Sequence, residues 1–145
     1  MKKGLLALMI SMAFFTLMAC NSSVTMSNID ANLNQEGVTY IDLRSWDEVS
    51  QFGYIRGFDI IPFYETLEAQ NILVRVGGSW TFRPEAIVDE AALRDLFDAS
   101  TTLYIMCRTG NRSGFVVEAL RHLGYTDVHN LGGIVDYQGS ERVFP

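Results

Sequence analysis

Residues 102–114 read TLYIMCRTGNRSG, an apolar run followed by a polar loop that contains a glycine. The run at 102–106 is continuously apolar, as is typical of a strand that is buried on both faces in the middle of a parallel sheet. A helix is predicted from about Arg112 to Leu123, because apolar side chains recur on one face and Gly124 can end it. Cys107 therefore stands at the carboxyl end of a central strand, where open α/β sheets bind their ligands.

The rest of the chain alternates short apolar runs with helical patterns. The predicted strands cover residues 38–43, 58–61, 102–106 and 127–131. One short helix is predicted to begin at Ser45, and three more are predicted over residues 64–70, 89–98 and 112–123. A short last helix, which carries Ile134 and Tyr137, is expected to begin at Gly132-Gly133. Ser45 and Glu48 have the spacing of a capping box, and Asp89 is placed to cap its helix. This alternation predicts an α/β fold with a parallel sheet.

The loop after Cys107 has the composition of an anion-binding nest. A tight turn from strand to helix directs successive backbone N–H groups inward, and Gly110 permits that turn. These N–H groups, Arg108 and Arg112 favour the charged form of the thiol. The same cradle would stabilise a persulfide, Cys107–S–S⁻, which can take sulfur from an anionic donor and pass it to a nucleophile. The alternative is an inert, buried cysteine that packs as a small hydrophobe.

Four segments in order resemble the single-domain rhodaneses, the thiosulfate:acceptor sulfurtransferases. They are Cys107-Arg-Thr-Gly-Asn-Arg-Ser113, Tyr40-Ile-Asp-Leu-Arg44, Gly53-Tyr-Ile-Arg-Gly57 and Leu131-Gly-Gly-Ile134 with Tyr137 beyond it. The resemblance extends over about residues 36–140. The sequence departs from the family pattern at Tyr54, where a histidine is usual, at Arg56, where a proline is usual, and at Tyr137, where a tryptophan is usual.

The resemblance implies a small doubly wound domain with a central parallel sheet flanked by helices. It implies that Cys107 accepts the sulfur and that the Arg112 side chain braces the loop. The implied substrate cradle is the backbone of Arg108, Thr109, Gly110, Asn111, Arg112 and Ser113. The expected partners are a small anionic sulfur donor such as thiosulfate and a thiol or cyanide-like acceptor, with no cofactor and no metal.

Two other functions stay open at this stage. A phosphatase or arsenate reductase is less favoured, because four residues separate Cys107 from Arg112 whereas cysteine phosphatases have five. A non-catalytic binding or sulfur-relay module at the membrane is the main alternative, suggested by an irregular excursion over residues 70–88. Trp80 and Phe82 in that excursion could belong to the core or wall the pocket.

The N-terminus predicts export and lipid anchoring. Lys2 and Lys3 precede an apolar run that is too short to span a bilayer comfortably, as in a signal peptide. The run ends in Leu17-Met18-Ala19-Cys20, which resembles the bacterial lipobox, so Cys20 is expected to carry the lipid; an ordinary signal peptide is the alternative. The predicted organisation is a signal peptide at 1–19, a lipidated tether at 20–35 and a rhodanese-like domain at 36–145, in the cell envelope and facing the periplasm or exterior.

The charge and composition of the chain argue against some classes of binding partner. The chain has 145 residues, is 48% hydrophobic and carries a formal charge of −6, which suits one packed domain and argues against nucleic-acid binding. An anionic substrate would therefore need a locally positive pocket. Asp42 and Arg44 are expected to form a structural ion pair, and His122 and His129 to be surface or packed residues.

Overall fold

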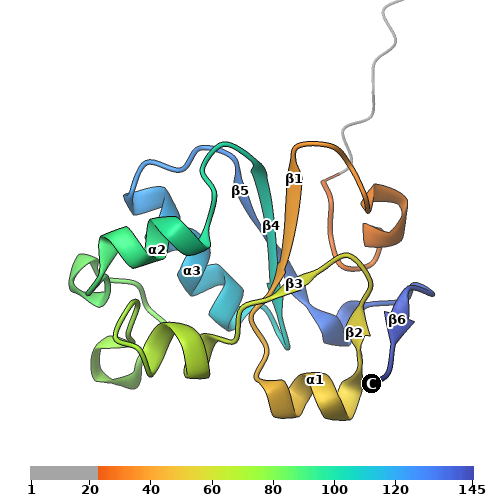
Figure 1. Ribbon diagram of the computed structural model, residues 1–145, viewed down its shortest axis with the longest axis horizontal. Helices are drawn as coiled ribbons and strands as arrows, with labels where there is room; N and C mark the ends of the chain where they lie inside the picture. The colour runs from red at the N-terminus through yellow and green to blue at the C-terminus, as the bar shows by residue number, and fades with distance from the viewer. Residues whose placement is uncertain (1–22) are drawn as a thin grey trace, which may run out of the picture.

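The computed structural model describes residues 23–145, so the predicted signal peptide and the lipidation site at Cys20 lie outside the described residues. A four-stranded, fully parallel sheet with the order β3-β1-β4-β5 forms the centre of the domain (Figure 1). The strands are β1 (Val38–Asp42), β3 (Asp59–Ile60), β4 (Thr102–Cys107) and β5 (Val128–Gly133). The predicted central parallel sheet is confirmed.

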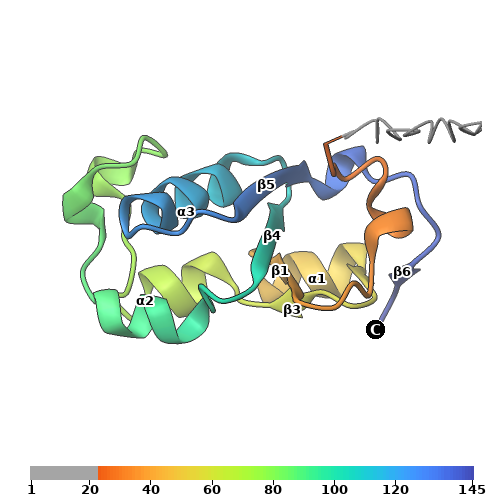
Figure 2. The same ribbon diagram turned by 90° about the horizontal axis from the view of Figure 1, so that it is seen from above.

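Longer helices pack against one face of this sheet (Figures 1 and 2). They are the wide helix η2 (Phe63–Glu68), α2 (Glu90–Leu96) and α3 (Asn111–His122). Side chains alternate along β4, so Leu103, Ile105 and Cys107 join the core under these helices, while Met106 joins the core on the opposite face. Cys107 therefore lies on the side of the sheet that α3 covers.

Short elements cover the opposite face. They are the 3₁₀-helices η1 (Ile29–Asn32) and η5 (Ile134–Asp136) and an antiparallel ribbon of β2 (Tyr54–Ile55) and β6 (Arg142–Val143). The sequence does not predict this ribbon, because two-residue strands are too short to show a periodic pattern.

The segment expected to be a tether packs against the domain from Val24 onward. Met26 and Ile29 are each 1% exposed and join the core of the second face. The Met26 amide donates to the carbonyl of Leu131 at 3.2 Å, and Asp30 accepts a hydrogen bond of 2.7 Å from the Tyr137 hydroxyl. Residues 24–33 thus belong to the folded domain, because two buried apolar side chains anchor an otherwise polar sequence.

Replacement of Ile29 by alanine tests this assignment. The substitution removes a fully buried side chain, so the free energy of unfolding should fall by about 2–5 kcal/mol. Urea unfolding followed by circular dichroism measures the change. Val88→Ala, at a 56% exposed valine, is the control and should shift stability by no more than about 0.5 kcal/mol. A loss as small as the control for Ile29→Ala would contradict the packed segment.

The remaining element boundaries agree with the expectations apart from two local differences. Helix α1 (Trp46–Phe52) begins with both hydrogen bonds of the predicted Ser45–Glu48 capping box. The glycines at 132–133 extend β5, since Gly133 pairs with Cys107 after a register shift, and the expected short helix follows directly as η5 with Gly133 as its N-cap residue but ends before Tyr137. In η2 the Ala69 amide bonds to the carbonyl of Tyr64, a wider turn than that of an α-helix.

The excursion after η2 is closed at its base and ordered as part of the domain. Leu73 and Ile87 form an antiparallel bridge, and the Val74 amide donates to the carbonyl of Ala86 at 2.9 Å.

None of the helices within residues 23–145 has the length and apolar character needed to cross a membrane.

Candidate active site

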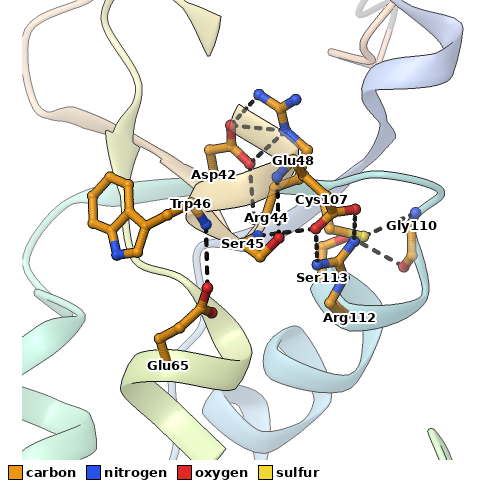
Figure 3. Close-up of polar contacts among 10 residues, drawn as sticks. All are labelled: Asp42, Arg44, Ser45, Trp46, Glu48, Glu65, Cys107, Gly110, Arg112 and Ser113. Carbon is orange, nitrogen blue, oxygen red and sulfur yellow. Dashed lines mark hydrogen bonds and ion pairs between the residues drawn. The ribbon is translucent and has the colours of Figure 1, made fainter. Parts of the chain in front are cut away.

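The sulfur of Cys107 accepts contacts from the loop that follows it (Figure 3). The backbone N–H of Gly110 donates to Sγ at 3.1 Å, and the Ser113 hydroxyl lies 3.5 Å from the same atom. Cys107 ends β4 and is only 1% exposed. The loop therefore curls over the thiol, and the amide of Gly110 directs its hydrogen at the sulfur.

The turn of the loop depends on the backbone conformation of Gly110 and on contacts of its carbonyl with Asn130 and Ser113. Gly110 has φ +100°, a conformation that favours glycine, and its Cβ position faces the backbone of Gly132 at 3.3 Å. Its carbonyl accepts a hydrogen bond from the Asn130 side-chain amide at 3.1 Å and lies 3.1 Å from the Ser113 hydroxyl. Asn130 of β5 thus fixes the loop from outside.

Asn130 is a site residue that the sequence analysis missed. Its Oδ1 lies 2.7 Å from the Ser113 hydroxyl and accepts a hydrogen bond of 2.9 Å from the Gly132 amide. It therefore links α3, β5 and the loop. Its place just before the Gly132-Gly133 pair, in a strand that ends beside Cys107, was the available signal.

Arg112 braces the site through Glu48 of α1. The guanidinium of Arg112 donates two hydrogen bonds to the Glu48 carboxylate, at 2.6 and 2.7 Å, and Arg112 is 7% exposed. Glu48 also accepts the 2.9 Å capping bond from the Ser45 amide. Its second role was not predicted, although the capping box marked the residue. The pair ties α1 to the start of α3, on either side of the loop.

The charges of this pair are stabilised by one another. Burial raises the pKa of Glu48, but the hydrogen bonds from Arg112 and Ser45 outweigh burial and hold the pKa at about 2. Burial lowers the pKa of Arg112, and its bonds to Glu48 more than compensate, so the pKa is raised. Both groups stay charged at neutral pH.

This pair predicts an acid-dependent loss of stability. The folded-state pKa of Glu48 lies below its value of about 4.3 in an unfolded chain, so the stability it contributes is present above that value. It is lost as the pH falls toward 2. In Glu48→Gln the difference in free energy of unfolding from wild type should shrink over this range, as measured by urea unfolding at several pH values. Glu36→Gln, at an exposed carboxylate, should track wild type; parallel pH curves for Glu48→Gln would contradict the ion pair.

A cavity of about 330 Å³ lies beside the loop. It is lined by Ser45, Glu48, Tyr64, Trp80, Arg108, Thr109, Asn111 and Arg112. Four of the six predicted cradle residues therefore face one cavity. The other two, Gly110 and Ser113, contact the sulfur directly.

Trp80 and Phe82 have different positions. Trp80 lines this cavity and also packs on Phe63 and Phe115, with ring centroids 5.1 and 5.8 Å apart. Phe82 packs on Phe115 and His122. The guanidinium of Arg75 lies 4.7 Å from the Trp80 ring centroid. The excursion thus supplies one wall of the cavity through Trp80, which is one of the two positions that the sequence left open for this residue. Phe82 packs against the core, which is the other of the two.

Two further pairs of ionisable side chains lie outside the Cys107 loop. Asp42 and Arg44 form the expected ion pair at 2.7 Å, and both side chains are fully buried. His129 pairs with Asp127 near the surface. Among residues 23–145 no group of three or more histidine, cysteine, aspartate or glutamate side chains is arranged to hold a metal ion.

Several solved structures of other proteins are similar to this chain. The chain resembles the structure of a rhodanese-like domain protein from Staphylococcus aureus, with 22% identity and a TM-score of 0.56, over 84% of this chain and 96% of that one. A rhodanese from E. coli matches with 25% identity and a TM-score of 0.47, over 74% and 99% of the two chains. A human single-domain sulfurtransferase matches with 24% identity and a TM-score of 0.42, over 77% and 91%.

A family model gives the assignment. No curated protein matches the chain. The model of the rhodanese-like domain matches residues 25–140, a span that includes the packed N-terminal segment, the Cys107 loop and the ribbon strand β2. The chain therefore belongs to the rhodanese-like domain family.

Proposed function

We propose that the protein transfers sulfane sulfur from a small anionic donor to a thiophilic acceptor through a persulfide on Cys107. The observation that carries the proposal is the backbone N–H of Gly110, which donates to the Cys107 sulfur at 3.1 Å, with the Ser113 hydroxyl 3.5 Å from the same atom. Donors in these positions stabilise negative charge on sulfur, which both the attacking thiolate and the persulfide carry.

The reaction would proceed in two half-reactions. With thiosulfate, the Cys107 thiolate attacks the outer sulfur, the sulfur–sulfur bond of the donor breaks, and sulfite leaves with the bonding electron pair. Cys107–S–S⁻ remains. An acceptor such as cyanide then attacks the terminal sulfur, thiocyanate leaves, and the thiolate is restored. Each half-reaction is a substitution at sulfur and needs no external oxidant or reductant.

The surroundings of the loop suit a small donor. Cys107 is 1% exposed, so a donor must present a single terminal sulfur to reach it. Arg108 lines the cavity beside the loop and is itself exposed, and it supplies the local positive charge that an anion needs in a chain with net charge −6.

Intact-mass measurement tests the proposal. Purified protein incubated with thiosulfate or a polysulfide should gain the mass of one sulfur atom, and cyanide should remove it with release of thiocyanate. Cys107→Ser should gain nothing. Ser113→Ala, which removes one of the two contacts on sulfur, should load more slowly. Failure of every donor to load the wild-type protein would refute the proposal.

The deep burial of Cys107 favours a second candidate, a binding or sulfur-relay module that turns over poorly with small acceptors. In that case wild-type protein would take up sulfur in the mass experiment yet release it slowly to cyanide. Faster release to a protein thiol than to cyanide would then identify the relay.

We propose in addition that the protein is held in the bacterial cell envelope by lipid on Cys20, facing the periplasm or the exterior. The support is the lipobox-like sequence at 17–20. Expression in a bacterium with labelled palmitate should label wild-type protein and not Cys20→Ala. Unlabelled wild-type protein would leave an ordinary signal peptide as the explanation.

A further inference from the structure

A second cavity, of about 190 Å³, adjoins the cavity described above. Its lining includes three arginines and three apolar side chains: Arg44, Arg108, Arg142, Phe52, Ile134 and Val135. Arg108 and Glu48 line both cavities, and Glu48 is neutralised by its two bonds to Arg112. This cavity forms where α1, η5 and β6 meet beside the end of β4.

The cavity carries unbalanced positive charge. Within residues 23–145 neither Arg108 nor Arg142 forms an ion pair with a carboxylate. Arg142 instead makes a long hydrogen bond of 3.4 Å to the carbonyl of Ile134. Two guanidinium groups without acidic partners in a chain of net charge −6 are a local attraction for an anion.

A buried donor adds a second, independent observation. Arg44 is fully buried, and its Nε and Nη2 donate to Asp42 and to the carbonyl of Gly53. Its Nη1 is buried with no hydrogen-bond partner in the described chain. An unsatisfied buried guanidinium N–H costs free energy, and its positive polarity favours an anion in the cavity that Arg44 lines.

From these observations we propose that this cavity is a binding site for a small organic anion, a carboxylate or sulfonate on a short apolar body. The anionic group would accept hydrogen bonds from Arg108 and Arg142 and would lie over Arg44, which lines the cavity. The apolar body would pack on Phe52, Ile134 and Val135. A volume of about 190 Å³ is on the order of six water molecules, so it fits a ligand of a few carbon atoms.

Binding of an anion in this second cavity does not require sulfur transfer at Cys107. None of its lining residues contacts the Cys107 sulfur, which bonds to Gly110 and Ser113 instead. Binding should therefore persist in Cys107→Ser, and this separates the failure of this inference from the failure of the proposed reaction. Arg108 lines both cavities, so an anion bound here would also influence the position of that side chain.

Titration of the ¹⁵N-labelled protein with butyrate, followed by amide chemical shifts, tests the site. Saturable shifts are expected at Phe52, Ile134 and Val135, with equal affinity in wild type and Cys107→Ser. Arg142→Met should weaken binding at least tenfold, and Val135→Glu, which adds a carboxylate at a 63% exposed position, should abolish it. Arg56→Met is the matched control, because Arg56 is an exposed arginine that lies outside the cavity lining, and it should bind within twofold of wild type.

Two further ligands test the chemistry of the site. n-Butanol lacks the charge and should not bind, while sulfate lacks the apolar body and should bind more weakly than butyrate. The inference is overturned if butyrate causes no saturable shifts, if Arg142→Met binds like wild type, if Cys107→Ser loses binding, or if sulfate binds as tightly as butyrate.

Discussion

Replacement of Asp42 by alanine is expected to lower the free energy of unfolding by about 3–5 kcal/mol, because it leaves the guanidinium of Arg44 buried without a counter-charge. Both side chains are fully buried, and the carboxylate accepts from Nε and Nη2 of Arg44 and from the backbone amide of the same residue. One nitrogen of the guanidinium already lacks a partner, so no spare acceptor is available. Urea unfolding at neutral pH measures the loss.

A surface pair provides the control for this prediction. Glu90 and Arg94 form an ion pair on α2 with side chains 55% and 43% exposed, and Glu90→Ala should cost only about 0.3–0.5 kcal/mol. A double variant, Asp42→Ala with Arg44→Met, should recover part of the loss because it removes the orphaned charge. A single variant as stable as Glu90→Ala would show that water reaches Arg44 in solution.

The parts of the fold that depend on local periodicity could be predicted from the sequence. Each of three local patterns predicts its element within a few residues: the apolar run at 102–106, the apolar face of α3 and the capping box at Ser45. The position of Cys107 at the end of a central strand followed directly. The structure confirms the parallel sheet that this alternation implied.

The parts that depend on contacts distant in the sequence could not be predicted. Ile29 lies in a polar stretch, and only the second face of the sheet, built from residues far along the chain, makes it a core residue. The bonds that join Glu48 to Arg112 cross 64 positions, and those of Asn130 to Gly110 cross 20. Each of these residues has an ordinary local role, so its contribution to the site appears only when the chain has folded.

Replacement of Gly133 by alanine is expected to slow sulfur loading of Cys107 about 10²-fold, because the loop backbone would have to move. A Cβ at Gly133 would lie 2.6 Å from Cα of Thr109 and 2.8 Å from the carbonyl carbon of Arg108, and it would also clash with the Arg108 carbonyl oxygen. These are backbone atoms, which cannot rotate away as a side chain can. Misplacement of a reacting group by about 1 Å is enough for a loss of this size.

The effect should come from geometry and not from unfolding alone. The rate of sulfur uptake is measured by intact mass on protein whose folded fraction has been determined by circular dichroism. Gly124→Ala is the control, since Gly124 lies beyond the far end of α3 and no atom lies within 4 Å of its Cβ position. It should load within a few-fold of wild type. Folded Gly133→Ala that loads as fast as this control would mean that the N–H of Gly110 need not lie on the sulfur, and the case for a cradle that prepares Cys107 for transfer would then fail.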